Sequence, residues 1–212
     1  MRGGALRDVS AALEQQPDDE DMLFIRARTW MQLDRYDAAK KDLDRALELE
    51  PDDNRAWLFR AQLHLRRGEL DQAVSDATAL LARRAADISG RETRALAYMA
   101  LGRNNDAIDD LSFVLGPPGD PGAATPVSAR FRQLFVQRAI LLIKAGRTAD
   151  ANLDLDTIFK AGGQRAVLRM QLFLRKNGFS EVALDGKRSA AFDSALKACF
   201  INQACGRDWV RF

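Results

Sequence analysis

The sequence predicts an all-α fold, in which a solenoid of paired helices is followed by a small helical C-terminal domain. Three observations lead to this class. Residue types recur with a period of 34, apolar residues within each period are spaced three and four apart, and a turn residue separates two helices in every period. A composition that is 47% hydrophobic and 29% charged fits a folded globular chain of 212 residues.

The period is visible in four columns, which continue after an insertion of ten residues between the third and fourth units. Small alanines let two helices approach closely, while arginine and aspartate columns are typical of pairing inside the repeat. We therefore expect the arginines and aspartates to bind one another rather than a ligand. The columns are Ala27, Ala61, Ala95 and Ala139; Ala39, Ala73, Ala107 and Ala151; Arg26, Arg60, Arg94 and Arg138; and Asp42, Asp76, Asp110 and Asp154.

Each unit reads as two amphipathic helices, which in the first unit are expected over residues 21–33 and 36–49. Glycine ends the first helix of the later units, because only glycine adopts a left-handed conformation at little cost. Proline ends the second helix of the first unit. These turn residues are Gly68, Gly102, Gly146 and Pro51.

This pattern resembles the tetratricopeptide repeat. The likeness rests on the 34-residue period, the aromatic column of Trp30 and Tyr98, Tyr36, the alanine columns and Pro51. It implies a right-handed α-solenoid over residues 1–161. The expected parts are a half repeat over 5–17, repeats over 20–53, 54–87, 88–115 and 132–161, and a proline-rich loop insertion over 116–127.

Solenoids bind partners on the concave face that the first helix of each pair lines. Helical spacing places a set of mostly apolar residues there, which suits an amphipathic helix or an extended apolar segment of a partner protein. We expect Phe24→Asp or Leu58→Asp to weaken partner binding without unfolding the chain. Ordinary packing between helices is the alternative role for these residues. The predicted groove consists of Phe24, Arg28, Met31, Leu58, Gln62, Leu65, Arg66, Leu96, Met99 and Ile140.

Residues 162–212 break the repeat pattern. A helix over 165–176, a loop to Gly186 and a helix over 189–200 are expected instead. The segment resembles the small helical peptidoglycan-binding-like domain, on the basis of Met170–Gln171, Leu174, Gly178–Phe179, Asp185–Gly186 and Ala195–Leu196. The resemblance implies a wall-binding or tethering module. Nine basic and four acidic residues in this segment also fit an anionic partner.

The only two cysteines, Cys199 and Cys205, lie six positions apart at the expected end of the last helix. A disulfide between them would stabilise a small domain and indicates an oxidising compartment such as the bacterial periplasm. Two reduced thiols in a cytoplasmic protein are the alternative.

Several classes of activity find no support in the sequence. One histidine and two cysteines exclude most metal sites built from those ligands, and His64 falls in a helix-packing column. No nucleotide, phosphate or zinc-protease motif is present, so we expect no catalytic residue and no cofactor. A net charge of +2 gives no argument for nucleic acid. Apolar runs such as 139–143 are too short to span a bilayer, which needs about 20 residues.

The sequence therefore favours a non-enzymatic interaction scaffold of the bacterial cell envelope, which binds a protein or peptide segment in the concave groove. One alternative is a peptidoglycan-binding protein that uses the solenoid as a spacer. Another is a regulatory fragment of a larger enzyme, because the chain begins with half a repeat and we expect further sequence upstream.

Overall fold

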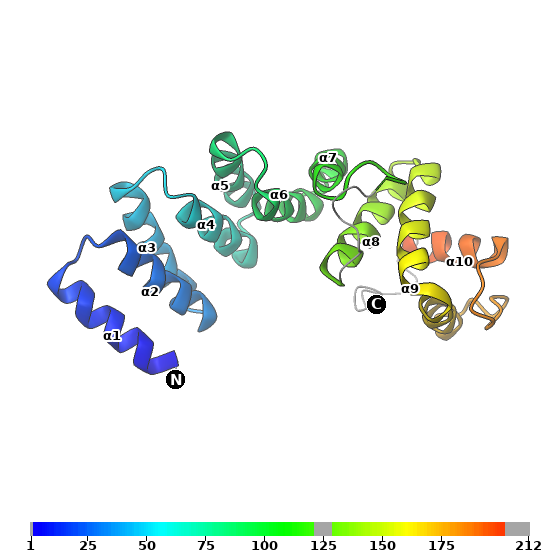
Figure 1. The fold of residues 1–212 in the computed structure, drawn as a ribbon, viewed down its shortest axis with the longest axis horizontal. Coiled ribbons are helices and arrows are strands. Elements are labelled where there is room, and N and C mark those ends of the chain that lie inside the picture. The colour runs from blue at the N-terminus through cyan, green and yellow to red at the C-terminus, as the bar shows by residue number, and fades with distance from the viewer. Residues whose placement is uncertain (1, 121–128, 202–212) are drawn as a thin grey trace. The chain divides into compact units, whose positions relative to one another are not determined.

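The computed structural model describes residues 2–120 and 129–201, and all regular secondary structure in these ranges is helical (Figure 1). The chain divides into two compact units, residues 1–103 and 104–212. The helices are α1 (Arg2–Gln15), α2 (Glu20–Gln32), α3 (Tyr36–Leu49), α4 (Asn54–Arg67), α5 (Leu70–Arg83) and α6 (Ile88–Ala100) in the first unit, and α7 (Asn104–Leu115), α8 (Ala129–Lys144), α9 (Thr148–Lys176) and α10 (Ala190–Ile201) in the second.

The first unit is built from helices that pack on their neighbours in chain order. The predicted helices over 21–33 and 36–49 correspond to α2 and α3 within one residue at each end. Helix α4 contacts both α2 and α6, so the first helices of successive pairs form a continuous row. Ala27, Ala39, Ala61 and Ala73 are fully buried, which explains the alanine columns as points of close helix approach.

The turn between paired helices requires a left-handed residue. Gly68 ends α4 with φ 76°, and a Cβ there would meet no atom within 4 Å, so only backbone conformation favours glycine. Asp34 occupies the same column in the first pair and adopts φ 57°. The Asp34 carboxylate accepts a hydrogen bond of 2.6 Å from the hydroxyl of Tyr36, which helps to hold this less favourable conformation.

A fifth column, which the sequence analysis missed, starts the first helix of three pairs. Asp19, Asp53 and Asp87 are spaced by 34 residues and are the N-cap residues of α2, α4 and α6. Each carboxylate accepts a hydrogen bond from a backbone N–H in the first turn, at 2.8–2.9 Å. An N-cap aspartate contributes about 1 kcal/mol to helix stability, so this column defines where each pair begins.

In the second unit, α8 packs on α7 and α9, and α10 packs on both α8 and α9. Helix α9 is interrupted at Gly163, whose φ of 59° and ψ of −163° are not helical. The part of α9 after Gly163 ends at Lys176, and α10 follows after a loop. These elements correspond to the helix, loop and helix that the sequence predicts for the C-terminal segment. The predicted domain boundary after residue 161 lies next to this kink, whereas the compact units divide after residue 103.

The predicted loop insertion is described only over residues 116–120. Gly116 lies directly after α7, and its carbonyl oxygen accepts a hydrogen bond of 2.5 Å from Nη1 of Arg138 on α8. This contact anchors the start of the insertion to the buried core of the unit. Residues 121–127 of the predicted insertion lie outside the described residues.

A search of the described helices finds none with the length and apolar character needed to cross a membrane.

Candidate partner-binding surface

The ten predicted groove residues lie on the first helix of each pair, α2, α4, α6 and α8, and differ in exposure. Three are buried in the core: Phe24, Met31 and Ile140. Five are half-buried: Leu58, Gln62, Leu65, Leu96 and Met99. The two arginines, Arg28 and Arg66, are exposed. Nine of the ten belong to the first unit, where the row of α2, α4 and α6 brings their helices together, and Ile140 belongs to the second.

Phe24 is buried because the next pair covers it. Its ring meets the ring of Phe59 on α4 edge to face, with centroids 4.9 Å apart, and the guanidinium of Arg55 lies 5.0 Å from its centroid. Only 7% of the residue surface is exposed. Phe24 therefore serves packing between pairs, and a charge there would disrupt the first unit in addition to any effect on binding.

Helix α4 carries four of the ten predicted groove residues, and none of them is buried. Leu58, Gln62 and Leu65 lie at helical spacing of four and three, which places them on one side of α4. Phe59 and Trp57 pack against the apolar cluster of the N-terminal pairs, whereas Leu58 and Leu65 are not part of that packing. Together with Arg66, these residues form a half-exposed apolar stripe that ends in a positive charge.

The arginine and aspartate columns pair as expected in three units. Arg26 donates to both carboxylate oxygens of Asp42 at 2.8 and 2.7 Å, Arg60 does so to Asp76 at 2.7 and 3.0 Å, and Arg138 does so to Asp154 at 2.8 and 2.6 Å. Each pair joins the first helix of a unit to its second helix. These columns therefore have a structural role, which leaves the α4 stripe as the better candidate for ligand contact.

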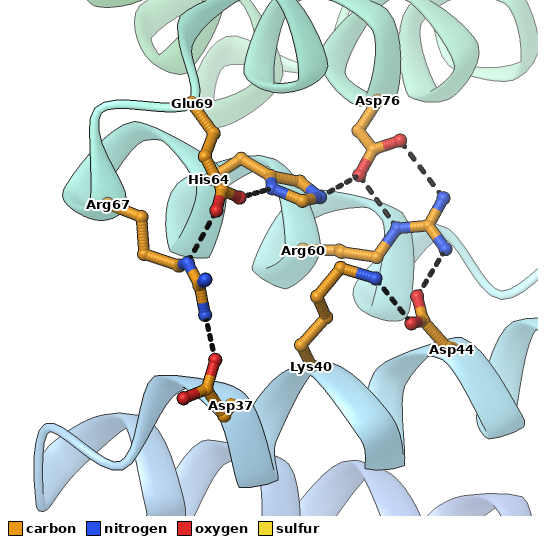
Figure 2. Close-up of polar contacts among 8 residues, drawn as sticks. All are labelled: Asp37, Lys40, Asp44, Arg60, His64, Arg67, Glu69 and Asp76. Carbon is orange, nitrogen blue, oxygen red and sulfur yellow. Dashed lines mark hydrogen bonds and ion pairs between the residues drawn. The ribbon is translucent and has the colours of Figure 1, made fainter.

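Figure 2 shows how the polar contacts extend from one pair to the next. Arg60 also donates to Asp44 on α3 at 2.9 Å, and Asp44 accepts from Lys40 at 2.6 Å. Arg67 donates to Asp37 on α3 at 2.5 Å and to Glu69 at 2.7 Å. The charged side chains drawn there therefore tie α3, α4 and α5 together.

His64 lies in the middle of this network (Figure 2). It is buried, as its helix-packing column predicts, and its Nδ1 atom is 2.5 Å from Oε2 of Glu69. Its Nε2 atom is 3.6 Å from Oδ2 of Asp76. The sequence predicted Asp76 as a partner of arginine but did not indicate that His64 contacts Asp76 or Glu69. Because Arg60 and Arg67 already neutralise them, the cluster is an internal network rather than a set of free catalytic groups.

Acid should weaken this network through Glu69. The hydrogen bond with His64, followed by that from Arg67, holds the pKa of Glu69 below its ordinary value. A carboxyl with a lowered folded-state pKa stabilises the fold above its unfolded pKa of about 4.3, and this stability is lost as the pH falls through the folded value. We expect Glu69→Gln to lower the melting temperature at pH 7 and to have little effect at pH 3. Glu50→Gln, at an exposed site, is the control. A Glu69→Gln effect that is equal at both pH values would contradict this role.

No group of three or more His, Cys, Asp or Glu side chains is placed to hold a metal ion within residues 2–120 and 129–201. Cys199 is buried on α10, but Cys205 lies outside the described residues, so the predicted disulfide stays a prediction.

Comparisons with known proteins agree with this architecture. The tetratricopeptide repeat family matches residues 27–88. No curated protein matches the chain by sequence. Among solved structures, a crystal structure of MamA is 14% identical with a TM-score of 0.66, and covers 78% of this chain and 91% of its own. A thermophilic tetratricopeptide-repeat protein of Thermus thermophilus is 21% identical with a TM-score of 0.51, and covers 91% and 95%. A tetratricopeptide-repeat protein of Parabacteroides merdae is 25% identical with a TM-score of 0.50, and covers 79% and 62%.

These likenesses support a fold rather than a particular activity. They agree with the helix pairs, the buried alanine columns and the turn residues described above. The predicted fold class is confirmed: the described residues are all-helical, and the tetratricopeptide-repeat structures that the chain resembles fit an α-solenoid.

Proposed function

We propose that the chain is a non-enzymatic scaffold that binds an apolar segment of a partner protein along the α4 stripe of Leu58, Gln62 and Leu65. The observation that carries this proposal is an apolar stripe left half-exposed on the first helix of a solenoid pair. Buried apolar contacts supply most of the binding free energy in such grooves, so an uncovered stripe is a favourable binding surface.

The neighbouring charges define the partner further. Arg28 and Arg66 are exposed on α2 and α4, and Leu96 and Met99 extend the apolar surface on α6. An amphipathic helix with an apolar face and acidic residues at its margin would match both features. The apolar face would supply affinity, and the charges would favour the correct orientation and faster association.

The test is selection of displayed peptides on the full chain, followed by binding to variants. We expect the selected peptides to lose at least about tenfold in affinity for Leu58→Asp, because an apolar residue central to an interface contributes about 1–2 kcal/mol or more. Leu70→Asp is the matched control, since Leu70 is also half-buried but lies on the second helix of the same pair. Selected peptides that bind Leu58→Asp as well as the parent would reject the stripe. Phe24→Asp is a poor probe, because the buried ring supports the fold.

We also propose that the scaffold acts in the bacterial cell envelope. Two sequence features support this location, the resemblance of residues 162–212 to peptidoglycan-binding-like domains and the predicted pairing of Cys199 with Cys205. Counting thiols under denaturing, non-reducing conditions, in protein isolated from its own compartment, tests the location. Absence of free thiols would support an oxidising compartment, and two free thiols would overturn the argument from cysteine.

Peptidoglycan binding is a second candidate function, favoured by the ordered Asp185–Gly186 turn and by the positive charge of the segment. We expect the full chain to sediment with protein-free sacculi and to remain bound at moderate salt if the interaction is specific. Binding that disappears at moderate salt would reflect charge alone, because exposed ion pairs are screened within about 10 Å at 0.1 M salt. If the chain does not sediment with sacculi at any salt concentration, its resemblance to peptidoglycan-binding-like domains extends to the fold but not to binding.

A further inference from the structure

A second candidate site lies in the second unit, where the two parts of α9 meet the loop before α10. An open cleft of about 540 Å³ is present there. Helix α9 supplies Phe159 and Lys160 before the Gly163 kink and Gln164 and Val167 after it, and the loop supplies Lys187 and Arg188. This volume lies within the range of about 300–1,000 Å³ that is typical of ligand pockets.

The cleft carries an excess of positive charge. Among the described residues that line the cleft, Asp156 is the only acidic one. Asp156 binds Arg188, and Arg188 also donates to Asp193 at 2.7 Å. The ammonium groups of Lys160 and Lys187 form no ion pair with any described residue. Both lysines are exposed, so two positive charges at the cleft are available to a ligand.

The loop that carries Lys187 is held in place by a buried glutamine. Gln171 on α9 is 1% exposed, and its Nε2 donates to Oδ1 of Asp185 at 2.9 Å and to the carbonyl of Lys187 at 2.8 Å. Its Oε1 accepts from the N–H of Gly186 at 2.8 Å. Hydrogen bonds from the N–H of Lys187 and from Gln171 lower the pKa of Asp185. The backbone of Lys187 is therefore fixed before any ligand binds, which reduces the entropic cost of binding.

The floor of the cleft is apolar. Phe159 and Val167 are both buried, and the ring of Phe159 packs edge to face on Phe192 of α10 with centroids 5.5 Å apart. The guanidinium of Arg188 lies 5.3 Å from the centroid of Phe159 and covers part of the ring. A ligand that fits this cleft therefore combines negative charge with an apolar group.

We propose that this cleft binds an acidic peptide segment, in which carboxylates pair with Lys160 and Lys187 while an adjacent apolar side chain packs on Phe159 and Val167. A bare phosphate ion would use the lysines but leave the apolar floor without contact. The Oε1 atom of Gln164, whose Nε2 donates to the carbonyl of Asp185 at 3.1 Å, is available to accept a peptide N–H. This site is separate from the α4 stripe, so either proposal can fail alone.

The test is a nuclear magnetic resonance titration of the full chain with the peptide acetyl-Glu-Leu-Glu-Leu-Glu-amide. Lys160→Glu combined with Lys187→Glu should weaken binding by about tenfold or more, because two attractions become repulsions. The matched control is Lys176→Glu combined with Lys197→Glu, since these lysines are exposed on α9 and α10 but do not line the cleft. We expect the control to change affinity by less than about twofold. Thermal melting verifies that both double variants remain folded.

Three further probes test which chemical features of the peptide the cleft recognises. The peptide with glutamine in place of glutamate tests the charges, the peptide with glycine in place of leucine tests the apolar floor, and inorganic phosphate tests a simple anion site. The proposal requires all three to bind more weakly than the parent peptide, with resonance shifts from the parent concentrated around residues 160–167 and 186–188. Absence of parent binding, equal binding to the charge-reversed chain, or equally tight binding of any of these three probes would overturn it.

Discussion

Arg138→Ala is expected to destabilise the second unit by about 3–5 kcal/mol, the range for breaking a buried ion pair. Arg138 and Asp154 are each 0% exposed, and two hydrogen bonds join them. Removing the guanidinium leaves the carboxylate of Asp154 buried without its partner and leaves the carbonyl of Gly116 without its donor. Urea unfolding followed by circular dichroism measures the change.

The partly exposed Arg26 provides a control for the buried Arg138. Arg26 forms the same pair with Asp42 in the first unit, but its side chain is 24% exposed. Water can partly replace that guanidinium, so Arg26→Ala should cost only about 1 kcal/mol. If both substitutions had equal effects, burial would not be the cause. The double variant Arg138→Met with Asp154→Leu should recover most of the loss, because a packed apolar pair can replace a buried ion pair.

The pH dependence of Arg138→Ala gives a second test. Burial already raises the pKa of Asp154, and the hydrogen bond and charge of Arg138 oppose that rise. Without Arg138 the folded state binds a proton at Asp154 more tightly than the unfolded state does. Stability of the variant, relative to the parent, should therefore increase as the pH falls from 7 towards 5, since protonation removes the buried charge. A deficit that grows on acidification would contradict this explanation.

Phe192→Ala is expected to destabilise the second unit by about 3–5 kcal/mol, the usual cost of removing a fully buried phenylalanine side chain. Phe192 is 0% exposed on α10 and packs on Phe159 of α9. The substitution removes this aromatic contact and leaves a cavity between the two helices. Unfolding in urea gives the free energy, and amide hydrogen exchange identifies the helices that lose protection.

The control for this variant is Phe179→Ala in the loop after α9, where the ring is only half-buried and the loss should be about 1–2 kcal/mol. We expect Phe192→Ala to increase exchange in α8, α9 and α10 together, because α10 contacts both other helices. If exchange increased in α10 alone, the C-terminal helix would not share a cooperative core with α8 and α9.

Much of the fold could be predicted from the sequence because repeated residues reveal repeated contacts. The pairs Arg26–Asp42 and Arg60–Asp76, the left-handed Gly68 and the bounds of α2 and α3 agree with the sequence analysis. Each of these features is local to one unit and recurs at the same offset, so one chain contains several copies of the same signal.

The exposure of individual groove residues could not be predicted in the same way. Phe24 is predicted to line the concave face, but Phe59 and Arg55 from the next pair bury it, and those contacts depend on how two pairs meet. The sequence also did not predict that Gln171 holds the turn at residues 185–187. This buried amide contacts residues 14–16 positions away, and such a contact does not recur along the chain as the repeat contacts do. Neighbouring pairs and non-local turns thus decide the details of both candidate sites.

The kink at Gly163 means that a single residue with non-helical backbone angles joins the two parts of α9. Its combination of positive φ and extended ψ is essentially restricted to glycine, and a Cβ there would meet no atom within 4 Å. Lys160 precedes this corner and Lys187 lies on the turn clamped to the helix that follows it. A ligand that joins the two lysines therefore spans the corner between the two parts of α9. If the angle at this corner varies, binding in the cleft and this angle are thermodynamically linked, and each shifts the other by the same free energy.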